Sequence, residues 1–154
     1  MIRVVLTVLV AVALLAASMP AVETARTATT AERIGAEADR LERAIGGLVD
    51  GSTPVTDPAM AAQTTVLVRV PSGFAAADVD RIALVESADR PGAVALAYRI
   101  DGRPERTVRL GTGPAEPAVD LVGGPIDLQP GGASRVRLRY VDDGRPTVRL
   151  RRVG

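Results

Sequence analysis

The apolar run at the N-terminus constrains this chain more than any other feature. Residues 4–22 carry no charge between Arg3 and Glu23. As a helix, this run would span about 28 Å at about 1.5 Å per residue, close to the roughly 30 Å hydrocarbon core of a bilayer. We therefore expect residues 1–22 to be a transmembrane signal anchor or a signal peptide, with the rest of the chain outside the cytoplasm.

Two fates of this run are open. For a cleaved signal, the run offers the basic Arg3, an apolar stretch of suitable length, and small residues at Ala16 and Ser18. Cleavage would release a secreted protein. The anchor is favoured because the next segment continues as a helix, with Pro20 bending it near the membrane interface. Arg3 and the terminal amine then favour a single-pass, N-in topology with the C-terminal domain outside the cell membrane.

Residues 23–50 are predicted to form an amphipathic helix that continues the run. Apolar residues alternate at spacings of three and four, which keeps them on one side of a helix. The helix is expected to end at Asp50, before Gly51. Its larger apolar residues are candidates for helix packing, either on the chain's own domain or on a partner in a short coiled coil. The apolar side comprises Ala31, Ile34, Ala38, Leu41, Ile45 and Leu48, of which Ile34, Leu41, Ile45 and Leu48 are those candidates.

After a linker at residues 51–62, the apolar period changes to two, which is typical of strands. Turn-forming Gly and Pro residues separate the strands, including Gly-Thr-Gly-Pro at residues 111–114, and a brief helical turn is an alternative for residues 75–80. Short strands at this spacing indicate an all-β antiparallel sandwich over residues 63–154. The predicted fold class is therefore α+β. Seven strands are predicted, at residues 64–70, 81–85, 94–100, 106–110, 118–122, 134–141 and 147–153.

The sequence Asp-Gly-Arg-Pro occurs twice, at residues 101–104 and 143–146. Asp-Gly between alternating apolar runs favours a β-hairpin. In the second hairpin, residues that share a face must pair, so Tyr140 should lie opposite Val148 and Leu138 opposite Leu150. This register leaves a three-residue loop at residues 143–145.

The same register predicts an arginine patch on the outer face of the sheet. Arg137 should lie opposite Arg151 and Arg139 opposite Arg149, with Arg135 beside them. Like charges directly opposite each other are unfavourable, so the patch requires neighbouring carboxylates, a bound anion or an acidic partner. It is either an ordinary solvated sheet face or a docking surface, and its five arginines are the candidate partner-binding residues.

Several residue types are absent, and their absence excludes whole classes of chemistry. The chain contains no Cys, His, Lys, Asn or Trp. Ser-His-Asp and Cys-His nucleophiles, structural zinc sites and Schiff-base chemistry are therefore excluded. With two Tyr, one Phe and a net charge of +1, the chain also lacks the stacking platforms and the strong positive field that nucleic-acid binding uses. We expect a protein that is not an enzyme and has no cofactor, metal or nucleic-acid partner.

Four stretches resemble a family of small, uncharacterised haloarchaeal membrane-anchored proteins. They are Met-Ile-Arg-Val-Val-Leu at the start, residues 16–23, Ala-Asp-Arg-Leu-Glu-Arg at residues 38–43, and Asp-Gly-Arg-Pro-Thr-Val ending at Val148. The resemblance covers nearly the whole chain and implies a context similar to that of type IV pilus or secretion machinery. The layout also resembles a pilin in architecture, although Arg3 stands where prepilin processing favours a small residue.

Together these features predict a membrane-anchored envelope protein that is an accessory or structural component of a pilus-like or secretion apparatus. Its partners would be the membrane and another protein of the cell envelope. The alternative is a secreted β-sandwich module that recognises an anionic ligand or an acidic partner. The oligomeric state does not follow from the sequence.

Overall fold

A computed structural model describes residues 1–110 and 117–154. Its first element is one long helix, α1 (Ile2–Asp50). The predicted α+β class is confirmed, and the seven predicted strands are present with ends shifted by at most two residues. The turn predicted at residues 111–114 lies outside the described residues. Within those described, the strands are β1 (Gln63–Arg69), β2 (Val79–Glu86), β3 (Val94–Ile100), β4 (Arg106–Leu110), β5 (Ala118–Leu121), β6 (Ile126–Asp127), β7 (Ala133–Asp142) and β8 (Pro146–Arg152).

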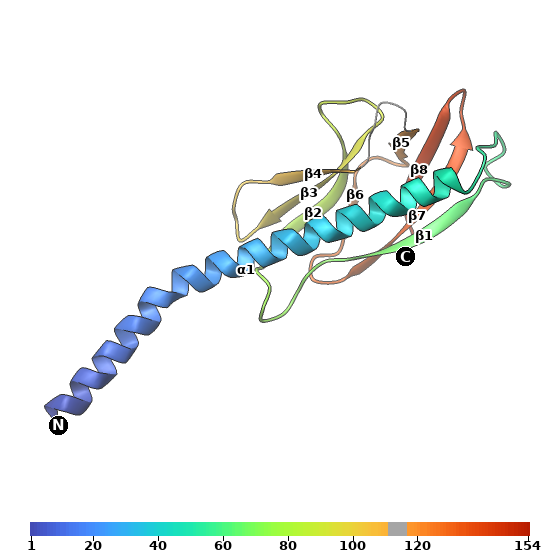
Figure 1. The fold of residues 1–154 in the computed structure, drawn as a ribbon. Coiled ribbons are helices and arrows are strands. Elements are labelled where there is room, and N and C mark those ends of the chain that lie inside the picture. Colours follow the sequence, from blue (N-terminus) through green and yellow to red (C-terminus); the bar gives the residue numbers. More distant parts are fainter. Residues whose placement is uncertain (111–116) are drawn as a thin grey trace.

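α1 is continuous through the point where the apolar run gives way to charged residues. Figure 1 shows it as an arm that projects beyond the sheets and changes direction as it approaches them. Pro20 lies inside the helix, where its missing N–H and its ring disturb the preceding turn and bend a helix. Thr24 Oγ1 also donates to the Pro20 carbonyl at 2.8 Å, a contact that favours bending. The helix ends at Asp50, as predicted, where the Gly51 N–H donates to the Gly47 carbonyl at 3.2 Å.

The strands form two four-stranded sheets. Sheet A has the order β1-β7-β8-β5, and sheet B has the order β4-β3-β2-β6. Sequential hairpins join β2 to β3, β3 to β4 and β7 to β8. The first Asp-Gly hairpin turns at Asp101 and Gly102, with φ values of +49° and +65°, and the Arg103 N–H closes the turn on the Ile100 carbonyl at 3.0 Å. Both central residues have the left-handed backbone that a type I′ turn requires.

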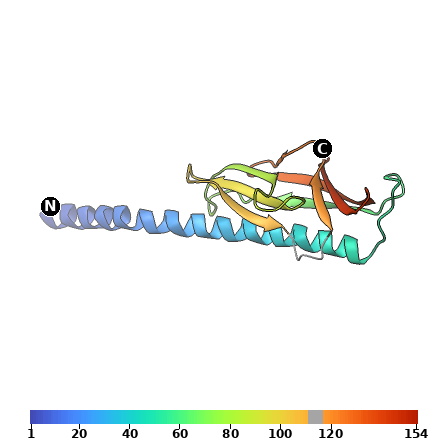
Figure 2. The same ribbon diagram turned by 90° about the horizontal axis from the view of Figure 1, so that it is seen from above.

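The second half of α1 closes one side of the sandwich. It contacts β1 and β4, which are edge strands of the two sheets. In Figure 1 the helix crosses the domain with β4 on one side and β1 on the other, and Figure 2 shows both sheets on the same side of the helix. An uncovered edge strand exposes backbone groups that can pair with another chain. Here the Arg69 N–H of β1 donates to the Glu37 carboxylate of α1 at 3.0 Å, so the helix both covers this edge and satisfies one of its donors.

Helix and sheets share one hydrophobic core. Because the chain has no cysteine, no disulfide supplements this core, and burial of apolar surface must supply most of the domain's stability. The largest fully buried side chains come from the helix and from both sheets, and include Ile34, Leu41, Ile82, Leu84, Leu96, Leu110, Leu138 and Leu150.

Three details differ from the sequence-based expectation. β5 pairs with β8 in parallel; β6 and β7 lie between them in the chain, and a connection of that length permits either direction of pairing. β6 was not predicted, since two residues are too few to show alternation. The helical turn considered for residues 75–80 is absent; instead, the Ala76 N–H closes a single turn on the Gly73 carbonyl at 3.0 Å, and β2 begins at Val79.

The segment expected to be a linker lies against β7. Val55 forms an isolated parallel bridge with Val141. The Tyr140 N–H donates to the Ala62 carbonyl at 2.9 Å, and the Asp142 N–H donates to the Val55 carbonyl at 3.0 Å. Residues 51–62 therefore lead from the end of α1 back along the β7 strand.

Candidate docking face on the outer side of sheet A

The hairpin of β7 and β8 carries a face of arginines that points away from the core. The predicted register is confirmed: Leu138 pairs with Leu150, and both are fully buried. Since side chains alternate across a strand, their neighbours must point outward. Gly144 in the three-residue loop has φ +84°, a left-handed conformation that glycine adopts without strain. We define the arginine face as Arg135, Arg137, Arg139, Arg149 and Arg151.

The row of this face nearest the hairpin loop contains its own polar partners. Across sheet A, this row runs Gln63, Arg139, Arg149, Asp120. Arg139 Nη2 donates to Gln63 Oε1 at 3.3 Å. Arg149 forms an ion pair with Asp143 of the loop, and its side chain is about one-third exposed. Intramolecular groups therefore already offset much of the repulsion between these two arginines.

The next row has no such compensation. It runs Thr65, Arg137, Arg151 across the sheet, and Arg135 lies beyond it, opposite Leu67 of β1. In the part of the chain that the structure describes, no carboxylate is ion-paired with Arg135, Arg137 or Arg151. All three side chains are exposed. Positive charge is therefore concentrated at one end of the face, where an acidic group from outside the chain would be favourable.

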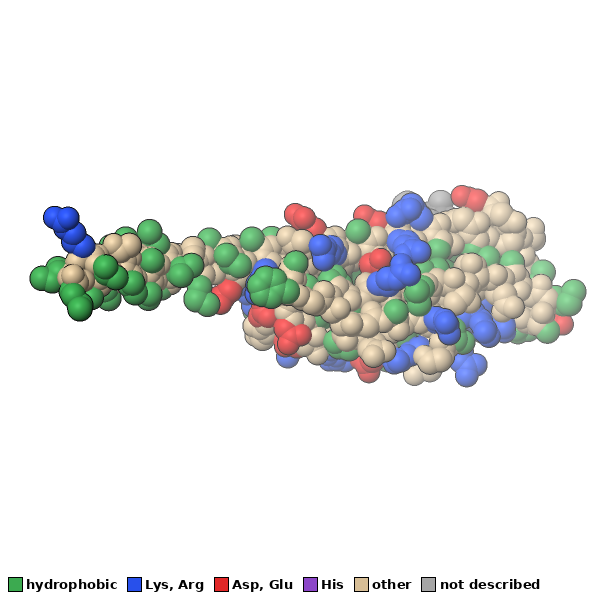
Figure 3. All heavy atoms as spheres, turned by 90° about the horizontal axis from the view of Figure 1, so that it is seen from below, with side chains coloured by type: hydrophobic (Ala, Val, Ile, Leu, Met, Phe, Trp, Pro, Cys, Tyr) green, Lys and Arg blue, Asp and Glu red, His purple; other side chains and the backbone are tan. Residues whose placement is uncertain are grey.

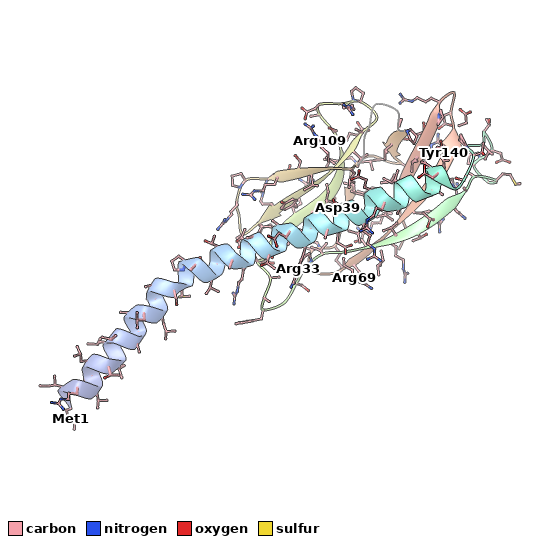
Figure 4. The ribbon with its side chains drawn as sticks, viewed as in Figure 1. Met1, Arg33, Asp39, Arg69, Arg109 and Tyr140 are labelled. Carbon is pink, nitrogen blue, oxygen red and sulfur yellow. The ribbon has the colours of Figure 1, made fainter. Side chains whose placement is uncertain are left out.

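The distribution of side chains divides the molecule clearly. Figure 3 shows hydrophobic side chains along the visible face of the arm, with a basic group near its tip, and charged side chains of both signs over the domain. Figure 4 shows Met1 at the free end of the arm, whereas Arg33, Asp39, Arg69, Arg109 and Tyr140 all lie in the other half of the molecule. Exposed apolar side chains therefore concentrate on the arm, and the arginine face belongs to the domain.

The four candidate helix-packing residues lie against the chain's own domain. Ile34, Leu41 and Ile45 are buried in the common core, and Leu48 is half-buried against it. The sheets thus occupy the side of the helix that a coiled-coil partner would need. The arginine face and the helix residues are separate: the former points outward from sheet A, and the latter point inward.

Two threonines extend the buried side of the helix toward the arm. Thr27 and Thr30 are buried, and Thr30 Oγ1 accepts a hydrogen bond at 2.9 Å from the N–H of Ala77, in the loop between β1 and β2. Because the predicted buried side of the helix was defined by apolar residues alone, it did not include either threonine. Their spacing of three, followed by four to Ile34, was the signal that could have found them.

The described residues contain no group of three or more acidic side chains that could hold a metal ion. Their buried side-chain nitrogen and oxygen atoms all have hydrogen-bond partners. Neither a metal-binding cluster nor an orphaned polar group therefore marks a reaction centre in this part of the molecule. The arginine face is the strongest candidate site that the geometry offers.

The fold and the site define a class of protein. It joins one N-terminal helix, long and apolar enough to cross a membrane or to serve as a signal sequence, to a β-sandwich with an outward arginine face. Residues 1–153 match the family described as Domain of unknown function (DUF7311), and the chain belongs to this family. No curated protein and no solved structure matches the chain. The family description names no organism or process, so the expected haloarchaeal and pilus-related context stays a prediction.

Proposed function

We propose that this protein is a non-enzymatic, single-pass envelope protein that holds its β domain outside the cytoplasm and docks an acidic partner on the arginine face. The pairing of Arg137 with Arg151 is the observation that carries the docking proposal. Two exposed, like-charged side chains directly opposite each other are unfavourable in the free protein. A carboxylate-bearing surface placed over them would remove that repulsion and form charge-assisted hydrogen bonds.

The anchor part of the proposal is supported by the exposure of the arm. Apolar side chains such as Leu6, Leu9 and Leu14 are more than half exposed on all sides of the helix. A helix that is apolar all round requires an apolar environment. Arg3 and the terminal amine lie directly before the run, and basic groups at the start of a first membrane helix support the N-in orientation.

An accessory or structural role in a pilus-like or secretion assembly is the finer part of the proposal. It is supported by the direct connection between arm and domain, since the same helix that leaves the apolar run enters the core of the domain. This connection keeps the arginine face close to the membrane that the arm would enter. A partner subunit in the same membrane could then meet the face in one orientation.

The docking proposal is tested by replacing Arg137 and Arg151 together with glutamate. Both side chains are exposed, so thermal unfolding of the full chain should change little, because exposed charges contribute little to folding. Crosslinking in native membranes should recover an acidic partner with the unmodified protein and much less of it with the double variant. Recovery by the unmodified protein should also weaken as salt rises, since exposed charge pairs are screened.

The matched control is the pair Arg81→Glu and Arg99→Glu. These arginines are exposed and lie opposite each other on β2 and β3 of sheet B. Arg81 forms an ion pair with Asp127 at 3.7 Å, so this pair, unlike Arg137 and Arg151, already has a carboxylate beside it, and the charge change is the same on the other sheet. The control should retain the partner. Equal recovery with all three proteins would contradict docking on the arginine face. The secreted alternative would be supported instead by a soluble mature form that starts at Met19 and binds an anionic ligand through the same arginines.

A further inference from the structure

One aromatic side chain of the domain is exposed close to the arm. Phe74 lies in the loop between β1 and β2 and is 90% exposed. Its ring contacts Arg26 of α1, whose Cζ lies 4.6 Å from the ring centroid. An arginine over an aromatic face forms a cation–π contact. This contact covers one face of the ring but leaves most of the side chain unburied.

The position of Arg26 along α1 gives the depth of this contact in a bilayer. Arg26 is four residues beyond Val22, the last residue of the apolar run, which is a rise of about 6 Å. The headgroup and interfacial region on each side of the hydrocarbon core is about 5–8 Å thick, from the difference between the core and the whole bilayer. If residues 4–22 span the core, Arg26 and Phe74 lie at the level of the lipid headgroups.

The loop is fixed to the helix at this level. The buried hydrogen bond from the Ala77 N–H to Thr30 Oγ1 at 2.9 Å attaches the loop to α1 one turn beyond Arg26. Glu23 and Arg26 of the helix, and Asp78, Asp101 and Arg103 of the two neighbouring loops, line an open groove beside it. The groove holds charges of both signs, which complements the phosphate and the amine of a zwitterionic headgroup.

From these observations we infer that the loop around Phe74 is a second, interfacial membrane contact, in which the Phe74 ring enters the boundary between headgroups and acyl chains. This inference rests on the proposed anchor, since the lipid is recognised by a surface continuous with the apolar arm. Aromatic side chains and arginines at this depth are typical of membrane interfaces, with the ring in the apolar boundary and the guanidinium at the headgroups. Two contacts, arm and loop, would prevent the domain from swinging about the bend at Pro20.

The absence of tryptophan from the chain allows a direct test with single-tryptophan reporters in the full-length protein. Three variants are compared in phosphatidylcholine vesicles whose acyl chains are brominated near the headgroup: Phe74→Trp, Leu9→Trp in the arm, and Met60→Trp. Met60 is 76% exposed and belongs to the segment that follows the far end of α1 (Figure 1). Because tryptophan itself favours interfaces, the Met60→Trp variant controls for that preference.

The inference predicts a blue-shifted emission and a loss of intensity by bromine quenching for the Phe74→Trp and Leu9→Trp variants, with neither change for Met60→Trp. Quenching of Leu9→Trp without quenching of Phe74→Trp would overturn the inference and leave the anchor standing. Absence of quenching in both would overturn the anchor and the inference together. Equal quenching of Phe74→Trp and Met60→Trp would mean that the whole domain adheres to the lipid, which would also overturn a specific contact at Phe74.

Discussion

The two halves of α1 share one backbone but differ in which of their sides meet protein. In residues 2–22, apolar side chains are exposed all round the helix, and the side-chain hydroxyl of Thr7 donates within the helix itself, to the Arg3 carbonyl at 2.9 Å. In the second half, only one side is buried, by the sheets, and Thr30 accepts from a residue outside the helix. The apolar side chains of the first half can therefore be buried only by surroundings outside the chain. Those of the second half are buried by the chain's own sheets.

This difference shows why neither half can be understood from helix propensity alone. Short isolated helices are marginal in water, and most helical stability in proteins comes from packing of an apolar face. For residues 27–48, that packing is with β1, β4 and the core between the sheets. For residues 2–22, it would be supplied by lipid. An acidic substitution in each half should therefore separate folding from membrane retention.

The largest effect is expected for Leu41→Asp, in the buried half. Leu41 is 2% exposed, so the variant places an unpaired carboxylate in the common core, which costs several kcal/mol or prevents folding. The free energy of unfolding would be measured by denaturant titration of the full chain in detergent. Membrane retention should be unaffected, because the arm is unchanged. Glu42→Asp introduces the same residue type at the adjacent exposed position and should be nearly neutral.

A stable Leu41→Asp variant would show that the helix does not depend on the sheets. The control also separates burial from the lower helix propensity of aspartate, since both variants carry that penalty equally. Leu41→Met, which conserves volume and polarity, should cost less than about 1.5 kcal/mol.

The next largest effect is expected for Val12→Asp, at the middle of the apolar run. A charge at the centre of a membrane helix costs about 2.5–3.5 kcal/mol on the insertion scale. The unmodified protein should remain with membranes washed in carbonate and high salt, and the variant should be released or fail to insert. Its domain should unfold at the same denaturant concentration as the unmodified protein, because Val12 contacts no part of the sheets. Release of the unmodified protein by carbonate would contradict the membrane anchor, and with it the comparison of the two halves of α1.

Sequence patterns predicted the strands and the hairpin register well because both follow from local rules. The alternation of Val136, Leu138 and Tyr140 fixes which side of β7 is buried, and a one-residue slip would expose all three. The paired arginines of the outer face followed from the same parity. The parallel pairing of β5 with β8 had no local signal, since it joins segments that are distant in the chain.

Which part of the molecule covers the apolar side of the helix depends on long-range packing, so it could not be predicted from the local pattern. The apolar spacing predicted that Ile34, Leu41 and Ile45 share one side, but not whether sheet or partner would cover it. The Arg26–Phe74 contact and the Glu37–Arg69 hydrogen bond link residues that are 48 and 32 positions apart. No periodic pattern connects such residues. Likewise, the division of the arginine face into a compensated and an uncompensated row required Gln63 and Asp143 to be placed beside it.

The smallest effect is expected for Thr30→Val, which tests where the protein-packed half begins. Valine has nearly the same shape but leaves the buried Ala77 N–H without its acceptor, a loss of about 1–3 kcal/mol. Thr27→Val is the matched control, because Thr27 Oγ1 only donates to the Glu23 carbonyl of the same helix at 2.9 Å. Loss of this hydroxyl therefore leaves no N–H group without an acceptor. Denaturant unfolding should therefore distinguish two buried threonines one turn apart, and hydrogen exchange at the Ala77 amide should accelerate only in Thr30→Val. Equal stability of the two variants would mean that the hydrogen bond from Ala77 to Thr30 does not contribute to folding, and that the loop between β1 and β2 is held by the strands alone.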